Sequence, residues 1–520
     1  MNYIEAEDDL LFSQSIKTDR FRLDELYAIW KKSFNEKEHK AAKFIDLVVW
    51  ISLSIAHLHR YAWVGDRKGY FVRYYNGKYY KDMYQEISRV AMKYMNREFI
   101  ANDKIRYVLA AVSANNKIQQ EDMNKDTDIL NYKNGYVIEY FDEITGKYSG
   151  RSELIPHDNK WNGSINKTTF QIPYDLDPDA TCPIAMKFVK DFCLGSEDPV
   201  LTERKVWEWI GYATQMSNRM QKALLIEGAG DTAKSTLLAI IDACLSPEDT
   251  NGISLKAFQT DRHAEWYIYD KVLNLFSERE EEDVFTGVGK LKRLIGDPMI
   301  TFIAKFGKGV KVKNITKHIW GFNTKPIVEG ADNSFYDKFD EIKACHVIEF
   351  KDQVPAFENI IIKNNEEMKG IIYQAYLALD RLFKRGHFED CSREKIEHSW
   401  RYNSDLVFRF IEDKCIINSD LTINTFYTYQ KTLFSAFSNF LDEIGTKRKK
   451  YLSMTSRTFT AEMGKNKIYV KQVRERIWEN KEYPQYNRPR AYINIMLKPE
   501  PDDSPLGDVT TNFIETEVKD

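Results

Sequence analysis

Residues 228–236 read GAGDTAKST. The apolar run 223–226 precedes this stretch, and the apolar helical segment 237–243 follows it. Such a context predicts a buried strand, a loop of small residues and a helix, with backbone N–H groups and the helix N-terminus facing an anion. The sequence therefore predicts a loop that binds the phosphates of a nucleotide.

Two side chains of this loop carry the expected chemistry. Lys234 is expected to neutralise the β- and γ-phosphates, and the Ser235 hydroxyl is expected to hold Mg²⁺. The usual Gly before the lysine is replaced by Ala233. Its methyl group is tolerated in a right-handed backbone and is strained where φ is positive. The alternative is a degenerate loop that is kept for structure. The predicted ATP site also includes Gly228, Gly230, Asp231, Thr232 and Thr236.

Strand and helix patterns alternate from about residue 224 to residue 350. This alternation predicts an α/β unit with a mainly parallel sheet. Within it, the strand pattern 271–277 ends before Glu278, and the strand pattern 318–322 ends before Asn323. The sequence therefore places both polar residues at the carboxyl ends of strands.

The two strand ends have different expected roles. Glu278 is expected to coordinate Mg²⁺ and to accept a proton from the attacking water. Asn323 is expected to position that water or to contact the γ-phosphate. Ser277 stands where many related ATPases carry an Asp, so metal coordination is expected from Ser235, Glu278 and water. A solvated surface glutamate is the alternative for Glu278.

A lysine-rich segment lies between these two strand patterns. Residues 304–313 read AKFGKGVKVK, in which lysines alternate with Phe, Gly and Val. This pattern predicts a hairpin with Lys308 at its tip, which would contact a phosphate backbone in a central channel. A lysine-blunted edge hairpin is the alternative. The candidate DNA contacts here are Lys305, Phe306, Lys308 and Lys311.

The composition indicates a globular chain of several domains. Of its 520 residues, 43% are hydrophobic and 29% are charged, which argues against wholesale disorder. The net charge of −3 does not indicate a polyanionic partner. Residues 445–490, however, hold thirteen Lys or Arg against four Glu, so this stretch is locally basic. The six cysteines form no CxxC pair, and the apolar run 44–56 is shorter than the roughly 20 residues that a membrane span needs. These features predict a cytoplasmic protein with reduced thiols and without a zinc site or a membrane span.

The local residue patterns along the chain predict six regions. They are an N-terminal helical region with a hairpin near 74–80 (1–115), a mixed α/β module (116–200), an ATPase core (201–355), a helical region (356–440), a winged-helix-like DNA-binding region (441–498) and a disordered acidic tail (499–520). In the fifth region, Thr455–Phe459 and a helix at Lys471–Trp478 are expected to form a helix-turn-helix with a basic wing, and Arg474 is a candidate DNA contact. Solvated basic helices are the alternative.

Four motifs occur in one order: GAGDTAKST, LNLFSE, LKRLIGD with AKFGKG, and WGFNTKP. Together they resemble the superfamily 3 helicases, specifically the primase-helicase C-terminal family of phages, plasmids and large DNA viruses. Upstream, NYKNGYVI, LIPH, IPYDLDPDATCP and WEWIGYA resemble that family's preceding domain and linker, so that the resemblance spans roughly residues 70 to 350. The resemblance implies an AAA+ P-loop core with an N-terminal helical and mixed domain and a C-terminal winged helix.

The resemblance also implies an activity. It implies a homo-hexamer that encircles single-stranded DNA at a fork, binds ATP and Mg²⁺ between subunits, and translocates 3′→5′ as a replicative helicase. Lys234 and Ser235 then match the Walker A positions, Glu278 the Walker B position and Asn323 the sensor. Lys308 matches the channel hairpin.

Two departures from the family pattern bear on this expectation. Residues 327–350, where the family supplies an arginine finger, contain no Arg. A different cation would then act in trans: Lys343, less plausibly Lys338, or alternatively Arg262. The chain also has no room for an attached primase, which implies a separate primase or origin-binding protein as a partner, or none. The competing interpretation is an ATP-binding oligomeric scaffold or switch that binds DNA and hydrolyses little ATP. An RNA-directed helicase is the third interpretation.

Overall fold

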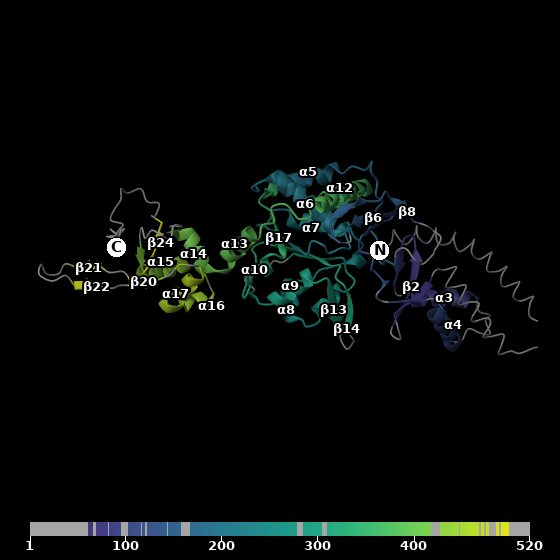
Figure 1. The fold of residues 1–520 in the computed structure, drawn as a ribbon. Helices are drawn as coiled ribbons and strands as arrows, with labels where there is room; N and C mark the ends of the chain where they lie inside the picture. The colour runs from purple at the N-terminus through teal and green to yellow at the C-terminus, as the bar shows by residue number, and fades with distance from the viewer. Residues whose placement is uncertain are drawn as a thin grey trace, which may run out of the picture. The chain divides into compact units, whose positions relative to one another are not determined.

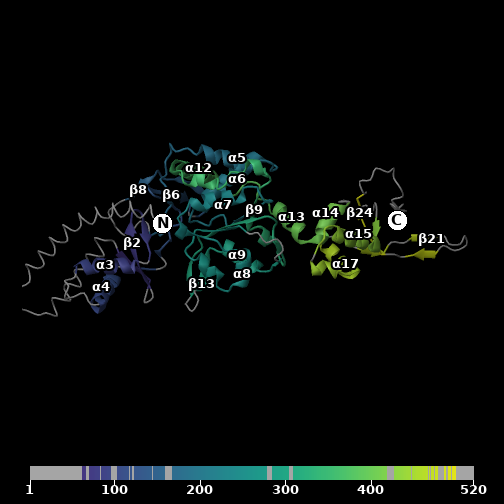
Figure 2. The same ribbon diagram turned by 180° about the vertical axis from the view of Figure 1, so that it is seen from behind.

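The computed structural model divides into two compact units. The first contains residues up to 278, 289–321 and 340–390, and the second contains 279–288, 322–339 and residues from 391 onward. Both are drawn as ribbons in Figures 1 and 2. The structure describes residues 61–65, 69–81, 83–94, 102–115, 117–119, 122–142, 144–157, 167–277, 284–303, 309–417, 427–446, 448–466, 468, 470–472, 475–477, 485–487, 490–493 and 495–498.

The described part of the first unit begins with a small four-stranded sheet in the order β3-β2-β1-β4. In the turn between β2 and β3, Asn76 and Gly77 have φ values of 42° and 91°, and Tyr75 pairs with Lys78. Positive φ at both turn positions is typical of a tight hairpin, so the hairpin predicted near 74–80 is confirmed. The elements here are β1 (Tyr61–Val64), β2 (Tyr70–Tyr75), β3 (Lys78–Tyr80), α3 (Tyr84–Tyr94), α4 (Asn102–Asn115) and β4 (Lys117–Ile118).

A second antiparallel sheet follows. Its strands are β5 (Ile129–Tyr132), β6 (Gly135–Phe141), β7 (Tyr148–Arg151) and β8 (Ile155–Pro156). β6 pairs with the other three strands. These strands lie within residues 116–200, for which the sequence predicts a mixed α/β module.

A five-stranded sheet forms the centre of the first unit, in the order β10-β11-β15-β9-β17. β11 pairs in parallel with both β10 and β15. The Ala344 N–H donates to Glu227 O at 2.7 Å just past the ends of β17 and β9, so these two strands also run in the same direction. The prediction of a mixed α/β fold with a parallel sheet is confirmed. The strands are β9 (Ala223–Glu227), β10 (Thr250–Asn251), β11 (Leu273–Ser277), β15 (Lys317–Phe322) and β17 (Phe339–Lys343).

Helices cover both faces of this sheet. In both views α5, α6 and α12 lie on one side and α8 and α9 on the other (Figures 1 and 2). α6 and α12 approach each other closely at Gly211, where a Cβ would lie 2.4 Å from Ala375 O, so only glycine fits. The helices are α5 (Pro183–Phe192), α6 (Pro199–Ala213), α7 (Lys234–Ala243), η3 (Pro247–Asp249), α8 (Leu255–Thr260), η4 (Ala264–Ile268), α9 (Val288–Gly296), η5 (Phe350–Asp352), α11 (Glu358–Ile362) and α12 (Asn365–Arg385).

Two further strands form the predicted lysine hairpin. β13 (Met299–Ile303) and β14 (Gly309–Lys313) pair antiparallel, with Thr301 opposite Lys311. The tip, residues 304–308, lies outside the described residues.

The second unit has its own aromatic core, in which Phe410, Phe437 and Phe459 are buried together. Ring centroids lie 4.8 Å apart for Phe437 and Phe459. The predicted helical region 356–440 is therefore divided, because α12 packs on α6 in the first unit whereas α13 onward belongs to the second. The elements are β12 (Val284–Phe285), β16 (Ile327–Val328), α10 (Asn333–Tyr336), α13 (Arg393–Ser404), α14 (Leu406–Lys414), β18 (Cys415–Ile417), β19 (Tyr427–Tyr429), α15 (Gln430–Glu443), α16 (Lys449–Leu452), α17 (Ser456–Lys465), β20 (Val470–Gln472), β21 (Glu475–Ile477), β22 (Gln485–Asn487), β23 (Arg490–Ile493) and β24 (Ile495–Leu497).

The helix predicted at Lys471–Trp478 is wrong. Residues 470–472 form β20, which pairs with β23, and residues 475–477 form β21, which pairs with β22. Apolar residues at 470, 473 and 477 have helical spacing, but a strand ladder overrides that local pattern. The predicted helix at Thr455–Phe459 is confirmed by α17, whose first turn has a capping box between Thr455 and Thr458.

Other predictions concern absences or lie outside the described residues. Among the described helices, none is long and apolar enough to cross a membrane. The described part of the chain contains no group of His, Cys, Asp or Glu arranged to hold a metal ion. The apolar run 44–56 and the acidic tail 499–520 lie outside the described residues.

Candidate functional site

The loop 228–233 leaves the central sheet at its strand β9. The four residues 223–226 are buried, so that β9 is fixed within the core. The strands that follow β9 directly in the chain lie on its β15 side, whereas β17 lies on its other side. In open parallel sheets, ligands bind beyond the carboxyl ends of strands at such a change of direction. The loop therefore occupies the place in the sheet where a ligand is expected.

The backbone of the loop presents a cluster of free donors. Eight consecutive N–H groups, from Ala229 to Thr236, have no hydrogen-bond acceptor among the described residues. The first N–H that is bonded inside helix α7 belongs to Leu237 and donates to Ala233 O at 3.1 Å. Unpaired N–H groups are costly when no water or ligand satisfies them, and at a helix N-terminus they attract anions.

Two residues of the loop have a left-handed backbone. Asp231 has a φ of 59° and Ala233, the N-cap of α7, has φ and ψ of 57° and 18°. Ala233 is therefore in the conformation that the sequence analysis described as strained, because its methyl group meets the following carbonyl oxygen. The glycine that usually stands here would avoid this strain.

Lys234 is folded back onto its own loop. Its Nζ donates to the carbonyl oxygens of Gly228 and Ala229 and, at 3.1 Å, to the Thr232 hydroxyl. Burial lowers the pKa of the Lys234 ammonium, although the nearby Asp231 carboxylate opposes this effect. The lysine thus lies against the loop that carries the free N–H groups.

The remaining loop residues also have defined surroundings. Thr232 is buried, and its hydroxyl donates to Ala229 O at 2.9 Å, which closes the loop. Ser235 is exposed, and its hydroxyl has no partner among the described residues, as a metal ligand requires. Thr236 is half-buried, and Gly230 faces open space, with nothing within 4 Å of an added Cβ.

A segment after β17, residues 344–350, lies along the loop, and we call it the strap. The Ile348 N–H donates to Asp231 O at 2.9 Å. At the other end of the strap, a Cβ on Gly228 would lie 2.4 Å from Ala344 O. Gly228 is therefore required for this close approach, and the strap is hydrogen-bonded to the loop at Ile348.

The strand ends predicted to complete the site are partly described. Ser277, the last residue of β11, is exposed and pairs with Gly321 of β15. Glu278 lies outside the described residues. Asn323 directly follows β15 and is half-buried. Their roles therefore stay predictions.

Two of the three candidate finger residues, Lys343 and Arg262, are exposed, and Lys338 is half-buried. Lys343 ends β17 and has no ion pair with any described residue. Arg262 follows α8, and no partner is found for it within the described part of the chain. Both side chains are thus accessible to a neighbouring molecule.

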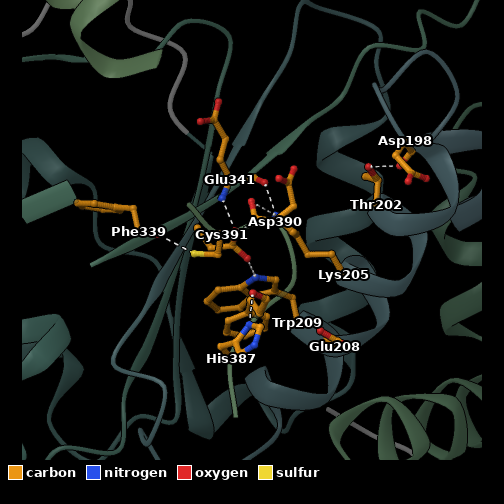
Figure 3. A network of polar contacts seen from close by, with 12 residues as sticks. Asp198, Thr202, Lys205, Glu208, Trp209, Phe339, Glu341, His387, Asp390 and Cys391 are labelled. Carbon is orange, nitrogen blue, oxygen red and sulfur yellow. Dashed lines mark hydrogen bonds and ion pairs between the residues drawn. The ribbon is translucent and has the colours of Figure 1, made fainter. Parts of the chain in front are cut away.

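A buried network fixes β17, the strand that carries Lys343. Asp340 is fully buried and accepts hydrogen bonds from Lys205 Nζ at 2.9 Å and Trp209 Nε1 at 2.6 Å. Figure 3 shows Lys205 and Trp209 extending from α6 toward this strand. Trp209 also stacks on Phe388, with 4.5 Å between ring centroids. The sequence analysis missed this network, for which the only signal was a charged residue within a strand pattern.

The lysine hairpin presents cations on one face. Lys311 is exposed, as are Thr301 and Met299 on the neighbouring strand β13. The Lys313 Nζ donates to the Thr127 hydroxyl at 2.6 Å, which ties the base of the hairpin to the preceding module. The other predicted DNA contacts, Lys305, Phe306, Lys308 and Arg474, lie outside the described residues.

A cavity of about 290 Å³ lies at the base of the hairpin. Met299, Phe302 and Lys311 of the hairpin line it together with Asn124 and Asp270. The Asn124 amide donates to Asp270 Oδ1 at 3.2 Å, so its polar wall is internally bonded.

A family model matches the part of the chain that contains this loop. A model of a family of unknown function (DUF5906) matches residues 226–335, which include the loop, β11 and the lysine hairpin. A search of curated proteins finds no match. Among solved structures, the apo structure of the NrS-1 C-terminal region has a TM-score of 0.49 and 13% identity, covering 88% of this chain and 100% of that chain. An A-form apo structure of the same region has a TM-score of 0.47 and 14% identity, covering 86% and 99%.

Proposed function

We propose that the chain is an ATP-driven motor that moves along single-stranded DNA as a homo-hexameric ring, with 3′→5′ polarity, during replication of a phage, plasmid or other mobile element. The observation that carries the proposal is the row of free N–H groups from Ala229 to Thr236, beside Lys234, at the carboxyl end of β9. Backbone donors and a lysine in this arrangement suit the phosphates of a nucleotide.

The proposed roles of the residues in nucleotide binding and hydrolysis are as follows. The N–H groups hold the phosphates, and Lys234 turns from the loop carbonyls to the β- and γ-phosphates. Ser235 and Glu278 hold Mg²⁺, which neutralises phosphate charge when it is bound. Glu278 accepts the proton of the attacking water, Asn323 orients that water, and Lys343 or Arg262 of a neighbouring subunit supplies a trans-acting cation.

The DNA-binding part of the proposal rests on the hairpin. Lys311 is exposed on β14, and its register places it beside Thr301 on the same face. An exposed cation on a hairpin whose base is fixed by Lys313 suits a phosphate backbone that moves past the hairpin. The winged-helix-like region 441–498 is proposed to contact duplex DNA.

The second candidate function is an ATP-binding oligomeric scaffold that binds DNA and hydrolyses little ATP. Three observations favour it: the left-handed Ala233, the uncharged Ser277 at the end of β11, and the lack of Arg in residues 327–350. The two functions share the nucleotide site and differ in turnover.

ATP binding to the full chain tests the shared part. Isothermal titration with Mg–ATP is expected to give saturable binding for the wild type and at least a tenfold weaker affinity for Lys234→Ala. Lys190→Ala, which removes an exposed lysine of α5, serves as the matched control and is expected to bind as the wild type does. Equal affinity for Lys234→Ala and the wild type would contradict both candidate functions.

A further inference from the structure

The strap carries an exposed aromatic side chain. Phe350 is 91% exposed, and Val347 and Val354 in the same stretch of chain are 56% and 53% exposed. Single exposed apolar residues are normal on a protein surface, but a group that includes a nearly bare phenylalanine marks a place where a ligand or partner binds.

The position of Phe350 relative to the phosphate loop is restricted by hydrogen bonds. Ile348, two residues earlier, donates its N–H to Asp231 O at 2.9 Å. Two residues of chain span at most about 7 Å, so the backbone of Phe350 stays close to the loop. The backbone of Phe350 thus lies near the loop that carries the free N–H groups.

A second segment meets the strap here. Gly195 has a φ of 80°, and a Cβ at this position would lie 3.2 Å from the Cβ of Cys345 on the strap. Leu194, next to it, is 41% exposed. Exposed apolar residues therefore occur on two neighbouring segments, Leu194 on one and Val347 and Phe350 on the other.

We propose that the strap is the surface for the nucleobase, with the ring of Phe350 stacked on the base of a nucleotide whose phosphates occupy the loop. This inference rests on the proposed nucleotide binding and adds where the base lies. A planar apolar base attached to phosphates held at Ala229–Thr236 needs an apolar surface nearby, and an aromatic ring provides one by stacking. Stacking tolerates any base, because every base has a π-face, so ATP and GTP are expected to gain similarly from Phe350.

The test separates base binding from phosphate binding. Titrations of the full chain with Mg–ATP, Mg–GTP and inorganic tripolyphosphate are compared for the wild type, Phe350→Ala and Phe350→Trp. Phe350→Ala is expected to weaken ATP and GTP roughly tenfold and to leave tripolyphosphate unchanged, whereas Phe350→Trp retains wild-type affinities. Tyr140→Ala, which removes another exposed aromatic ring, on β6, is the matched control.

Any one of five results would overturn the inference. Unchanged ATP affinity of Phe350→Ala would show that the ring does not touch the base. A change of the oligomeric mass of Phe350→Ala without a change of ATP affinity would assign the ring to contacts between copies of the chain. Equal loss of ATP and tripolyphosphate would show a structural role. If the wild type binds tripolyphosphate as tightly as ATP, phosphate binding by the loop is supported but base binding by the strap is not. If the wild type binds neither ligand, the proposed function is overturned as well.

Discussion

Asp340 and Lys205 form an ion pair in the interior of the first unit, with 2.9 Å between Oδ1 and Nζ and exposed side-chain fractions of 0% and 6%. The other carboxylate oxygen accepts the indole N–H of Trp209. The pair joins α6 to β17, which lies beside β9 in the central sheet. It therefore helps to hold the strand whose continuation, the strap, is bonded to the phosphate loop.

Breaking this pair on one side is expected to destabilise the protein strongly. Asp340→Ala leaves Lys205 buried without its counter-charge, so we expect a loss of about 3–5 kcal/mol in the free energy of unfolding. Asp242→Ala, at an exposed position on α7, is the control and is expected to change it by less than about 0.5 kcal/mol. Chemical denaturation followed by circular dichroism measures both. A loss below about 1 kcal/mol for Asp340→Ala would contradict the structural role of the pair.

The left-handed backbone of Ala233 predicts a stabilising substitution. Ala233→Gly relieves the contact of the methyl group at a φ of 57°, so we expect the free energy of unfolding to rise by roughly 1 kcal/mol. Ala229, which does not have a positive φ, is the matched position, and Ala229→Gly is expected not to raise the free energy of unfolding. Thermal unfolding of the two variants distinguishes them. A melting temperature of Ala233→Gly below that of the wild type would show that the loop does not hold this conformation.

A buried histidine in the central sheet predicts a pH dependence of stability. Burial lowers the pKa of His318 to about 3 from its ordinary value near 6.5. Between these values the unfolded chain binds the proton and the folded chain does not, so stability falls as the pH falls from 6.5 toward 3. His318→Gln is expected to remove this contribution, which amounts to at most about 1.4 kcal/mol per pH unit. Unfolding of both proteins is compared at pH 6.5, 5.5 and 4.5, and parallel curves would contradict the prediction.

The exposed lysine of β14 predicts a change in DNA affinity. Lys311→Ala is expected to weaken binding of a single-stranded oligonucleotide and to reduce the slope of log K against log salt by about 0.7, the value for one phosphate contact on a single strand. Lys190→Ala on α5 removes an exposed lysine away from the hairpin sequence and is expected to leave the slope unchanged. Fluorescence anisotropy over a range of salt concentrations measures both. The same slope for Lys311→Ala and the wild type would assign the hairpin to the edge-protecting role.

The strand and loop at the centre of the central sheet and the β2–β3 hairpin of the small sheet could be predicted from the sequence because their signals are local. The buried run 223–226, the small residues of the loop and the paired turn residues Asn76 and Gly77 each determine their own backbone. The ion pair of Asp340 with Lys205 could not be predicted, because its partners are 135 residues apart and neither has a distinctive neighbourhood. The strands at 470–477 were misread because pairing with β22 and β23 decides their conformation.

The candidate site was predictable to a different degree for each residue. Gly228 and Lys234 follow from the loop motif, whereas the left-handed φ of Ala233 depends on how the loop closes against the strap. Nothing in the sequence signalled that Ile348 would bond to Asp231, since that contact depends on the direction of β17 beside β9. Tertiary placement therefore adds the strap to a candidate site whose proposed phosphate-binding part is local in the sequence.

The steady-state ATPase rate with and without single-stranded DNA, for the wild type and for Glu278→Gln, distinguishes a DNA-stimulated ATPase from a static scaffold. We expect turnover that DNA stimulates and that Glu278→Gln reduces by at least about a hundredfold, because the proton acceptor is lost. Tight ATP binding by the wild type without turnover would contradict the motor and leave the ATP-binding scaffold.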